Sequence, residues 1–406
     1  MASGWNDKKC SNAVKRNDNL KRGIGQNVRP RLVFIPFLIL LFHTTVFSFT
    51  FHTKGQIIGW LTANADKSIK PQAGLRYIPT FSLEKNFEKG PSLDFELSLN
   101  AYGTARFHAL DDVRTDGDID PYRLWARFST SQFEARIGLQ KINFGSATLL
   151  RPLMWFDSID PRDPLQLTDG VYGLLLRYYF LNNANIWFWG LLGNDNLRGW
   201  EVLASDKDTP EFGGRIQVPL GNGEAAATFH HRNIATTGIL QPIDLETLKF
   251  SENKYALDGK WDIGIGIWFE AVLVHQDTSV LPYPWQRALN VGLDYTFSLG
   301  NGLNAIGEHF VMTASQEAWD SGESVEFTAV ALNYPLGLLD ALAGIFYYDW
   351  KNKDFYSFLR WQRTYDRWSI HVMAFWNPSR FAIYQLEQYS SLFSGKGIQI
   401  MLVYNY

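Results

Sequence analysis

The chain has little cysteine, little charge and no long apolar segment outside its N-terminal region. One of its 406 residues is cysteine and 19% are charged, whereas about a quarter of residues are charged in soluble domains. A single cysteine excludes disulfides within the chain and thiolate metal sites. Past the N-terminal region, no apolar run approaches the roughly 20 residues of a membrane helix. The net charge of −3 gives no basic excess of the kind that binds nucleic acid.

The N-terminal region has the order of a targeting segment. Eight basic residues precede an apolar run over 32–49, and Val46 and Ser48 are acceptable small residues for a cleavage site. We expect residues 1–48 to be a signal peptide and residues 49–406 to be the mature protein, with a membrane anchor as the alternative. Removal would take away Cys10. It would leave a net charge of about −9, because the segment holds eight basic and two acidic residues.

Aromatic residues and two-residue periodicity are what the chain has in excess. Aromatics make up 15% of it. Apolar and polar side chains alternate over 93–108 and 289–299, and the last ten residues, 397–406, carry one continuously apolar face. Alternation over this length puts every apolar side chain on one face of a strand. Mean hydropathy is only −0.17, the intermediate value expected of strands with one apolar and one wet face.

Short and long connections take turns along the chain. Tight turns are indicated at Thr130–Gln132, Asn182–Asn183, 221–223, 300–302 and 365–367, where Gly and Asn supply the backbone angles of hairpins. Long links are indicated at 109–119, 146–170, 195–210, 234–252, 279–286, 315–324 and 377–396. This sorting predicts an all-β fold. We expect a transmembrane antiparallel up-and-down barrel of about 18 strands, or 16, with short periplasmic turns and long extracellular loops.

A barrel of this kind predicts a place in the cell and several partners. We expect the outer membrane of a Gram-negative bacterium, with lipid and lipopolysaccharide around the barrel and strand 397–406 presented to the outer-membrane assembly machinery. A homo-oligomer stays open. Aromatics near strand ends are expected in girdles at the membrane surface, with the core of a soluble protein as the alternative; they are Tyr122, Tyr178, Phe180, Trp187, Trp368, Trp376 and Tyr404.

Placing the apolar positions outward turns a set of arginines inward. The predicted pore-lining arginines are Arg76, Arg106, Arg123, Arg127, Arg136, Arg177 and Arg215. They favour anions by charge and by forked hydrogen bonds. Acidic residues on the opposite half, Asp258, Glu270, Asp294 and Glu308, would add a field across the channel. The alternative is that these charges only solvate a wet lumen and pair with one another.

The link at 146–170 is unusually apolar for a surface loop. It contains Leu149, Leu150, Leu153, Met154, Trp155 and Phe156 together with three prolines, and such side chains need burial. We expect this third outer loop to fold inward, bringing Asp157, Asp160 and Asp163 toward the arginines as further pore-lining residues. A cap over the mouth and a contact between protomers are the alternatives.

The segment Ala135–Gly145 and the Asp-Pro-rich loop after it resemble the strand and loop of porin-like outer-membrane channels, including the alginate-export type. The resemblance implies a passive channel, a loop between the fifth and sixth strands that narrows it, and an arginine-rich pore. The many inward carboxylates depart from the alginate type. The predicted function is therefore passage of small hydrophilic or anionic solutes, including oligosaccharides or uronates. The alternative is a barrel that serves an export system or binds surfaces.

Enzyme and cofactor chemistry has weak signals. Asp111, Asp112, Asp116, Asp118 and Asp120 crowd one link, but Pro121 stands where a calcium loop needs glycine. Ser369 and His371 share a face without an assignable acid, and His230-His231 invites the same hydrolase interpretation. Phosphate-loop, dinucleotide and zinc motifs are absent. We predict no enzymatic activity, no metal and no cofactor.

Overall fold

The computed structural model describes residues 49–65, 71–88, 90–107, 113–235, 249–278, 281–378, 393 and 395–406. The expected signal peptide, Cys10 and the pair Asp111 and Asp112 lie outside the described residues. The strands are β1 (Thr50–Asn64), β2 (Gln72–Asn86), β3 (Ser92–Phe107), β4 (Val113–Ser129), β5 (Phe133–Gln140), β6 (Val171–Tyr179), β7 (Asn185–Leu191), β8 (Glu211–Leu220), β9 (Gly223–Ala235), β10 (Lys249–Asp262), β11 (Gly266–Gln276), β12 (Trp285–Phe297), β13 (Leu303–Ser315), β14 (Glu323–Pro335), β15 (Asp340–Asp349), β16 (Asp354–Thr364), β17 (Trp368–Trp376) and β18 (Lys396–Asn405).

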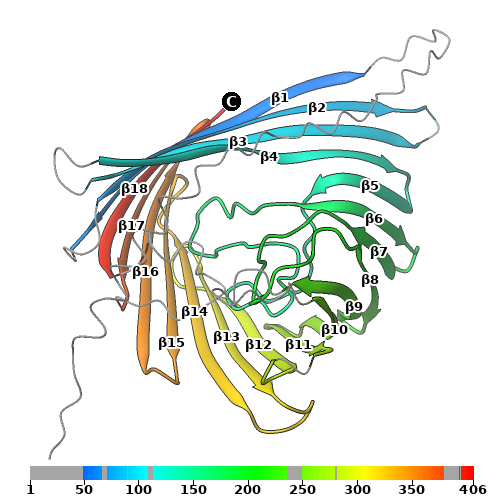
Figure 1. The fold of residues 1–406 in the computed structure, drawn as a ribbon. Helices are drawn as coiled ribbons and strands as arrows, with labels where there is room; N and C mark the ends of the chain where they lie inside the picture. The colour runs from blue at the N-terminus through cyan, green and yellow to red at the C-terminus, as the bar shows by residue number, and fades with distance from the viewer. Residues whose placement is uncertain are drawn as a thin grey trace, which may run out of the picture. The chain divides into compact units, whose positions relative to one another are not determined.

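These 18 strands close into one antiparallel barrel. Each strand pairs with its sequence neighbours, and β18 pairs with β1 from Gln56–Asn405 to Asn64–Gly397 (Figure 1). Closure removes the open edges whose unpaired backbone groups are costly in hydrocarbon. The prediction of about 18 strands is confirmed. Within the part of the chain that the structure describes, no helix has the length and apolar content needed to cross a membrane.

Strand alternation separates two faces. On β12 the outward Leu289, Val291 and Leu293 are about half exposed, while Asn290 between them is buried inside. The same outward apolar row appears on β10 and β18, for example at Leu257 and Ile400. An apolar outer surface around a closed barrel is the surface that lipid covers.

Two aromatics were wrongly expected in the girdles. Tyr178, Phe180, Trp368 and Trp376 are exposed, in keeping with that expectation. Trp187, by contrast, faces inward, where the Arg177 guanidinium carbon lies 3.9 Å from its ring centre. Tyr122 packs inward against the buried Ile58–Ile78 cluster.

A register shift between Ser98 and Leu99 explains the case of Tyr122. Arg123 pairs with Ser98 but Pro121 pairs with Leu99, which leaves Tyr122 as an extra residue in β4. Beyond this bulge the parity of β4 changes. Asp116, Asp118 and Asp120 belong to strand β4, where they lie opposite Thr104, Tyr102 and Asn100 of β3. The expected link 109–119 is therefore wrong over most of its length.

The connections sort as expected into short turns at one end and longer ones at the other. Two of the longer connections, 141–170 between β5 and β6 and 192–210 between β7 and β8, run inside the barrel (Figure 1). They bring buried side chains into the lumen, where the candidate site is.

Candidate functional site

The connection 141–170 crosses the lumen, and we call its residues 142–168 the plug. Leu150, Leu153, Met154 and Phe156 of the plug are fully buried. In a solvated lumen such side chains would be exposed, so they must pack on the barrel wall. The expectation that this loop folds inward, rather than capping the mouth, agrees with the structure.

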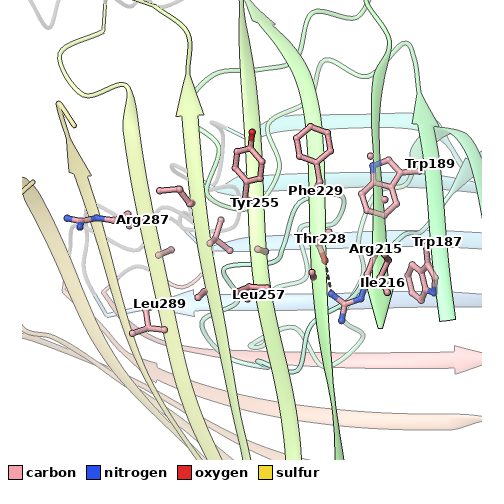
Figure 2. A pocket seen from close by; sticks show the side chains of 18 of the residues that line it. Trp187, Trp189, Arg215, Ile216, Thr228, Phe229, Tyr255, Leu257, Arg287 and Leu289 are labelled. Atoms are coloured by element: carbon pink, nitrogen blue, oxygen red, sulfur yellow. Dashed lines mark hydrogen bonds between the residues drawn. The ribbon is translucent and has the colours of Figure 1, made fainter. Parts of the chain in front are cut away.

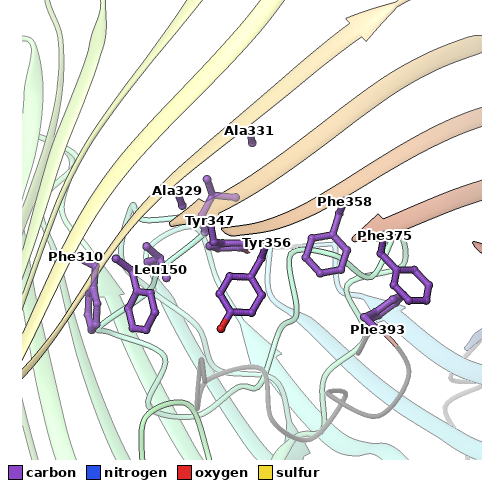
Figure 3. Close-up of a cluster of buried hydrophobic side chains, with 11 residues drawn as sticks. Leu150, Phe310, Ala329, Ala331, Tyr347, Tyr356, Phe358, Phe375 and Phe393 are labelled. Carbon is purple, nitrogen blue, oxygen red and sulfur yellow. The ribbon is translucent and has the colours of Figure 1, made fainter. Parts of the chain in front are cut away.

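One side of the plug rests on an aromatic wall. Leu149 and Leu150 pack against buried side chains of β13 to β17, including Phe310, Phe327 and Tyr347 (Figure 3). These wall residues point inward, where two-residue periodicity alone would predict water-facing positions. The plug takes the place of water over this part of the wall.

The other side of the plug packs on β7 and β11. Phe144 stacks on Trp189 with ring centres 5.8 Å apart, and Phe156 meets Trp189 edge-on at 5.3 Å. Trp155 and Leu153 belong to the same cluster as Val272 of β11. The plug therefore bridges two parts of the inner wall through apolar contacts.

Glu308 of β13 pins the plug through its backbone. Its carboxylate accepts hydrogen bonds from the backbone N–H groups of Thr148 (2.6 Å), Leu149 (3.1 Å) and Leu150 (2.7 Å). The Thr148 hydroxyl adds another at 3.1 Å. Successive N–H groups that converge on one anion form a nest, and here a wall carboxylate occupies it.

Glu270 of β11 makes a second pin. It accepts hydrogen bonds from the N–H of Ala147 (2.8 Å) and of Leu153 (3.3 Å). Asn290, on β12 between the two carboxylates, donates to the Leu150 carbonyl at 2.7 Å. Gly145, at φ 92°, makes room, since a Cβ there would meet a Glu270 oxygen at 2.3 Å.

The three plug aspartates make contacts inside the plug. Asp157 pairs with Arg151 at 2.6 Å and Asp160 with Arg162 at 2.7 Å. Asp163 accepts the N–H groups of Leu165 and Leu167. Their hydrogen bonds brace the plug and are not made with the inward arginines of β2 to β8.

The connection 192–210, which we call the second loop, locks onto the plug. Trp200 stacks on Phe310 with ring centres 4.4 Å apart and donates to the Arg151 carbonyl at 3.0 Å. Gly199, at φ 52°, lets the Met154 carbonyl approach to where a Cβ would be. The sequence analysis indicated a long link at 195–210 but did not predict that it folds into the lumen, although its Trp200 was a signal.

Buried charges attach the second loop to β8, β9 and β10. Glu201 pairs with Arg232 (2.9 Å) and Lys254 (2.7 Å), and Arg198 pairs with Glu211 (3.0 Å). Burial alone would raise the pKa of Glu201, but the cations of Arg232, Lys254 and Arg198 lower that pKa below its ordinary value. The attachment is therefore strongest where Glu201 is ionised.

A different inner wall, on β4 to β6, carries arginines that water reaches. Arg127, Arg136 and Arg177 converge on Glu134, at 4.0, 3.0 and 3.6 Å. Arg136 also lies over the Trp125 ring at 4.9 Å. The Nε atoms of Arg136 and Arg177 find no hydrogen-bond partner among the described residues. We call Arg127, Arg136, Arg177 and Glu134 the arginine cluster.

The remaining predicted arginines divide by surroundings. Arg123 is buried and donates to the Thr168 carbonyl at 2.9 Å, which holds the end of the plug. Arg215 forms a bidentate pair with Asp258 at 2.6 and 2.7 Å. Arg76 lies beside the Trp60 and Tyr102 rings, and Arg106 is exposed at the end of β3.

The other chemical signals assemble no site. Among the described residues, no group of three or more His, Cys, Asp or Glu side chains is placed to hold a metal ion. The Ser369 hydroxyl lies 3.0 Å from Nε2 of His371, but the Nδ1 of His371 has no partner in the described part of the chain. His230 pairs inside with Glu211 at 3.2 Å, while His231 contacts Asn253 on the outer face.

A hollow of about 1280 Å³ lies on the outer face of β7 to β13 (Figure 2). Phe229, Tyr255, Leu257 and Leu289 contribute to its lining. Arg215 of the same region is bonded to Thr228 at 2.9 Å. Because its lining is mostly outward and apolar, this hollow belongs to the lipid-facing surface and not to a path for solutes.

Comparison with known proteins bears on the fold. No protein-family model matches the chain, and no curated protein matches it. OccAB1 of Acinetobacter baumannii matches with a TM-score of 0.53 at 10% identity, over 88% of this chain and 96% of that one. The fold is that of an outer-membrane porin. An apolar outer face around this closed porin barrel places the protein in the outer membrane of a Gram-negative bacterium.

Two further porins superpose less closely, and the fold assignment does not rest on them. The anion-selective porin of Comamonas acidovorans has a TM-score of 0.47 at 12% identity, over 88% of this chain and all of that one. Salmonella typhi OmpF, in complex with daunomycin, has a TM-score of 0.47 at 9% identity, over 88% and 97%. The alginate-export subtype stays a prediction.

Proposed function

We propose that the protein is a passive outer-membrane channel for small hydrophilic or anionic solutes. They pass along the arginine side of a lumen that the loop 146–170 narrows. The observation that carries this is the arginine cluster, in which three guanidiniums share one carboxylate on a wall that water reaches. The side chain of Arg127 is 33% exposed and those of Arg136 and Arg177 are 16% exposed.

The electrostatics of this wall favour anions modestly. Guanidinium groups that water reaches bind carboxylates through forked, charge-assisted hydrogen bonds. Asp94 and Glu96 lie on the same wall, and with Glu134 they equal the three arginines of the cluster in number; Asp94 already pairs with Arg127 at 2.8 Å. A small anion therefore gains over a cation through the forked hydrogen bonds and not through a net positive charge, and the wall does not exclude cations.

The solute class follows from the rings beside the arginines. Trp125 and Trp187 lie beneath Arg136 and Arg177, so flat faces and cationic groups occur together. A uronate or acidic oligosaccharide offers both a carboxylate and an apolar ring face, which matches this pairing. Within the wider group of small anions, we propose uronates and acidic oligosaccharides as the solutes. An alginate-like substrate would belong to this class.

Reversal potentials in planar bilayers test the proposal. The wild-type channel in a salt gradient should prefer chloride over potassium. Arg127→Ala, Arg136→Ala and Arg177→Ala combined should move the reversal potential toward the cation side, because Asp94, Glu96 and Glu134 then dominate the wall. Arg123 is kept, since it holds the plug. The matched control is Arg363→Ala near the end of β16. An unchanged reversal potential in the triple variant rejects the role of the cluster.

A second function is favoured by the extent of the plug. A lumen crossed by protein also suits a closed barrel that docks an export system or binds surfaces. Deleting Leu150–Pro164 separates the two, since a constricted channel should conduct more, whereas a docking protein should lose its partner without any gain in conductance.

We propose that residues 1–48 are a signal peptide removed from a mature barrel of residues 49–406, and that strand 397–406 is presented to the assembly machinery. Lipid and lipopolysaccharide surround the barrel, and a homo-oligomer is compatible with it. We propose that the protein has no catalytic activity. Ser369→Ala and His371→Ala should leave conductance unchanged, and neither substitution should lower lipid or peptide turnover.

A further inference from the structure

The plug is held at the carboxylate wall by contacts of an unusual kind. Glu270 and Glu308 bind backbone N–H groups of five plug residues, Ala147 to Leu150 and Leu153. Both carboxylates are almost fully buried, at 0% and 2% exposed. The pins therefore depend on two wall side chains and mainly on the plug's backbone, with one plug side chain, the Thr148 hydroxyl, adding to them.

We propose that the plug is a gate, closed in this structure, whose latch is the pair of carboxylates Glu270 and Glu308. Releasing the latch lets residues 142–168 withdraw from β11 to β13 and widens the lumen. This inference rests on the proposed channel function and adds that the constriction is movable.

The latch is specific to the closed position. Gly145 permits the close approach of Glu270, and a side chain there would overlap the carboxylate. Glu308 accepts hydrogen bonds from the N–H groups of Thr148, Leu149 and Leu150, and Asn290 also donates to it at 3.2 Å. If either glutamate loses its charge, the buried N–H groups have a weaker acceptor, and if it loses its side chain they have none. The closed position is then the one that becomes less favourable.

Part of the remaining attachment suits a movable element. Leu149 and Leu150 pack on the aromatic wall with their side chains, and packing is non-directional. The plug joins the barrel through β5 at Gln140 and β6 at Val171, so its ends stay fixed while its middle leaves the wall. The second loop stays on β8 to β10 through its buried ion pairs, so the bond from Trp200 to the Arg151 carbonyl breaks when the plug moves.

The first test compares one molecule with its latch open and shut. In a Cys10→Ser background, Thr148→Cys and Glu308→Cys remove the pin and allow a short reducible bis-methanethiosulfonate to replace it. Bilayer recordings should show larger or more frequent openings before cross-linking, a return to wild-type conductance after it, and recovery on reduction. Conductance that stays the same through the whole cycle overturns the gate. Both states are one folded protein, so misfolding does not produce the difference.

The second test removes charge without a cross-link. Glu270→Gln and Glu308→Gln together should raise mean conductance several-fold, because amides bind the cradle more weakly than carboxylates. Asp294→Asn is the matched control, since Asp294 lies on β12 of the same wall and makes no contact with the plug among the described residues. Heat-modifiable migration in gels verifies that each barrel is folded. Equal conductance in the double variant and the control contradicts the inference.

The outcomes separate the gate from the channel. If wild type conducts and the latch variants match it, the gate fails while the channel stands. If every folded variant, including the Leu150–Pro164 deletion, leaves the bilayer silent, the proposed channel fails and the gate with it.

Discussion

Two inner walls of the same barrel treat their charges in opposite ways. On β4 to β6, arginines and carboxylates stay within reach of water and share partners loosely, as Arg127 does with Asp94 and Glu134. On β11 and β13, Glu270 and Glu308 are buried beneath the plug. The difference shows that a lumen charge acquires its role from what covers it. Uncovered charge attracts solute, and covered charge holds a loop.

This comparison corrects the idea of a field between a basic and an acidic wall. Of the acidic residues expected opposite the arginines, Glu270 and Glu308 bind the plug and Asp258 pairs with Arg215. Their charge is taken up by near neighbours over a few ångströms. The arginine wall then acts on solutes with only its own carboxylates to offset it.

Asp258→Ala should give the largest loss of stability. Its partner Arg215 would become an unpaired buried cation, which costs about 3–5 kcal/mol. The measurement is urea unfolding of the barrel in vesicles, followed by tryptophan fluorescence. A loss below about 1 kcal/mol would mean that this pair is as wet as the arginine cluster, and would erase the contrast between the two kinds of charge.

Phe310→Ala should give the next largest effect, a loss of about 3 kcal/mol in the free energy of unfolding. Truncating this fully buried aromatic leaves a cavity beneath Leu150 and Trp200. The same unfolding experiment applies. Leu289→Ala, outward on the neighbouring β12, is the control, since lipid fills the space that it leaves. Equal losses at both positions would indicate that the plug does not seal the aromatic wall.

Asp94→Ala should cost less than about 1 kcal/mol, because its partner Arg127 is one-third exposed and solvent replaces the ion pair. The variant should instead act on permeation and make the channel more selective for anions. Reversal potentials and unfolding on the same sample are the checks. A large loss of stability with unchanged selectivity would reverse the roles assigned to the two walls.

Acid should loosen the second loop to a modest extent. The pKa of Glu201 is lower in the folded protein than its ordinary value. Its contribution to stability is therefore present above that ordinary value and is lost as pH falls through the folded value. Conductance should rise only as the pH falls well below the ordinary glutamate value of 4.5, because Glu201 stays ionised in the folded protein down to its lowered pKa. Glu201→Gln should show less of this rise, and an equal rise in both would exclude Glu201 as the cause.

The barrel itself could be predicted because its cause is local. Alternation at residues such as Leu289 to Leu293, together with Gly and Asn turns at 221–223 and 300–302, determines strand faces and hairpins without knowledge of distant contacts. Strand number and the inward loop followed from the same signals. The errors at Trp187 and Tyr122 arose where parity depends on a strand's start or on a bulge.

The roles of the inward charges could not be predicted in this way. Glu308 and Glu96 have the same position in the pattern, inward on a strand, but only Glu308 meets the plug's backbone. That contact joins residues about 160 positions apart, and the donors are N–H groups that every residue has. The inward positions of Phe310 and Phe327 could not be predicted for the same reason, because these side chains pack against the plug, which follows β5 and is distant in the sequence.

Thiol accessibility tests the contrast between the walls most directly. In a Cys10→Ser background, Arg136→Cys reports on the arginine wall and Ala329→Cys on the wall beneath the plug, where Ala329 is fully buried. A water-soluble anionic methanethiosulfonate applied to protein in vesicles should modify position 136 rapidly and leave position 329 protected until the latch is released. Equal rates at the two positions, or faster modification of position 329, would contradict the account.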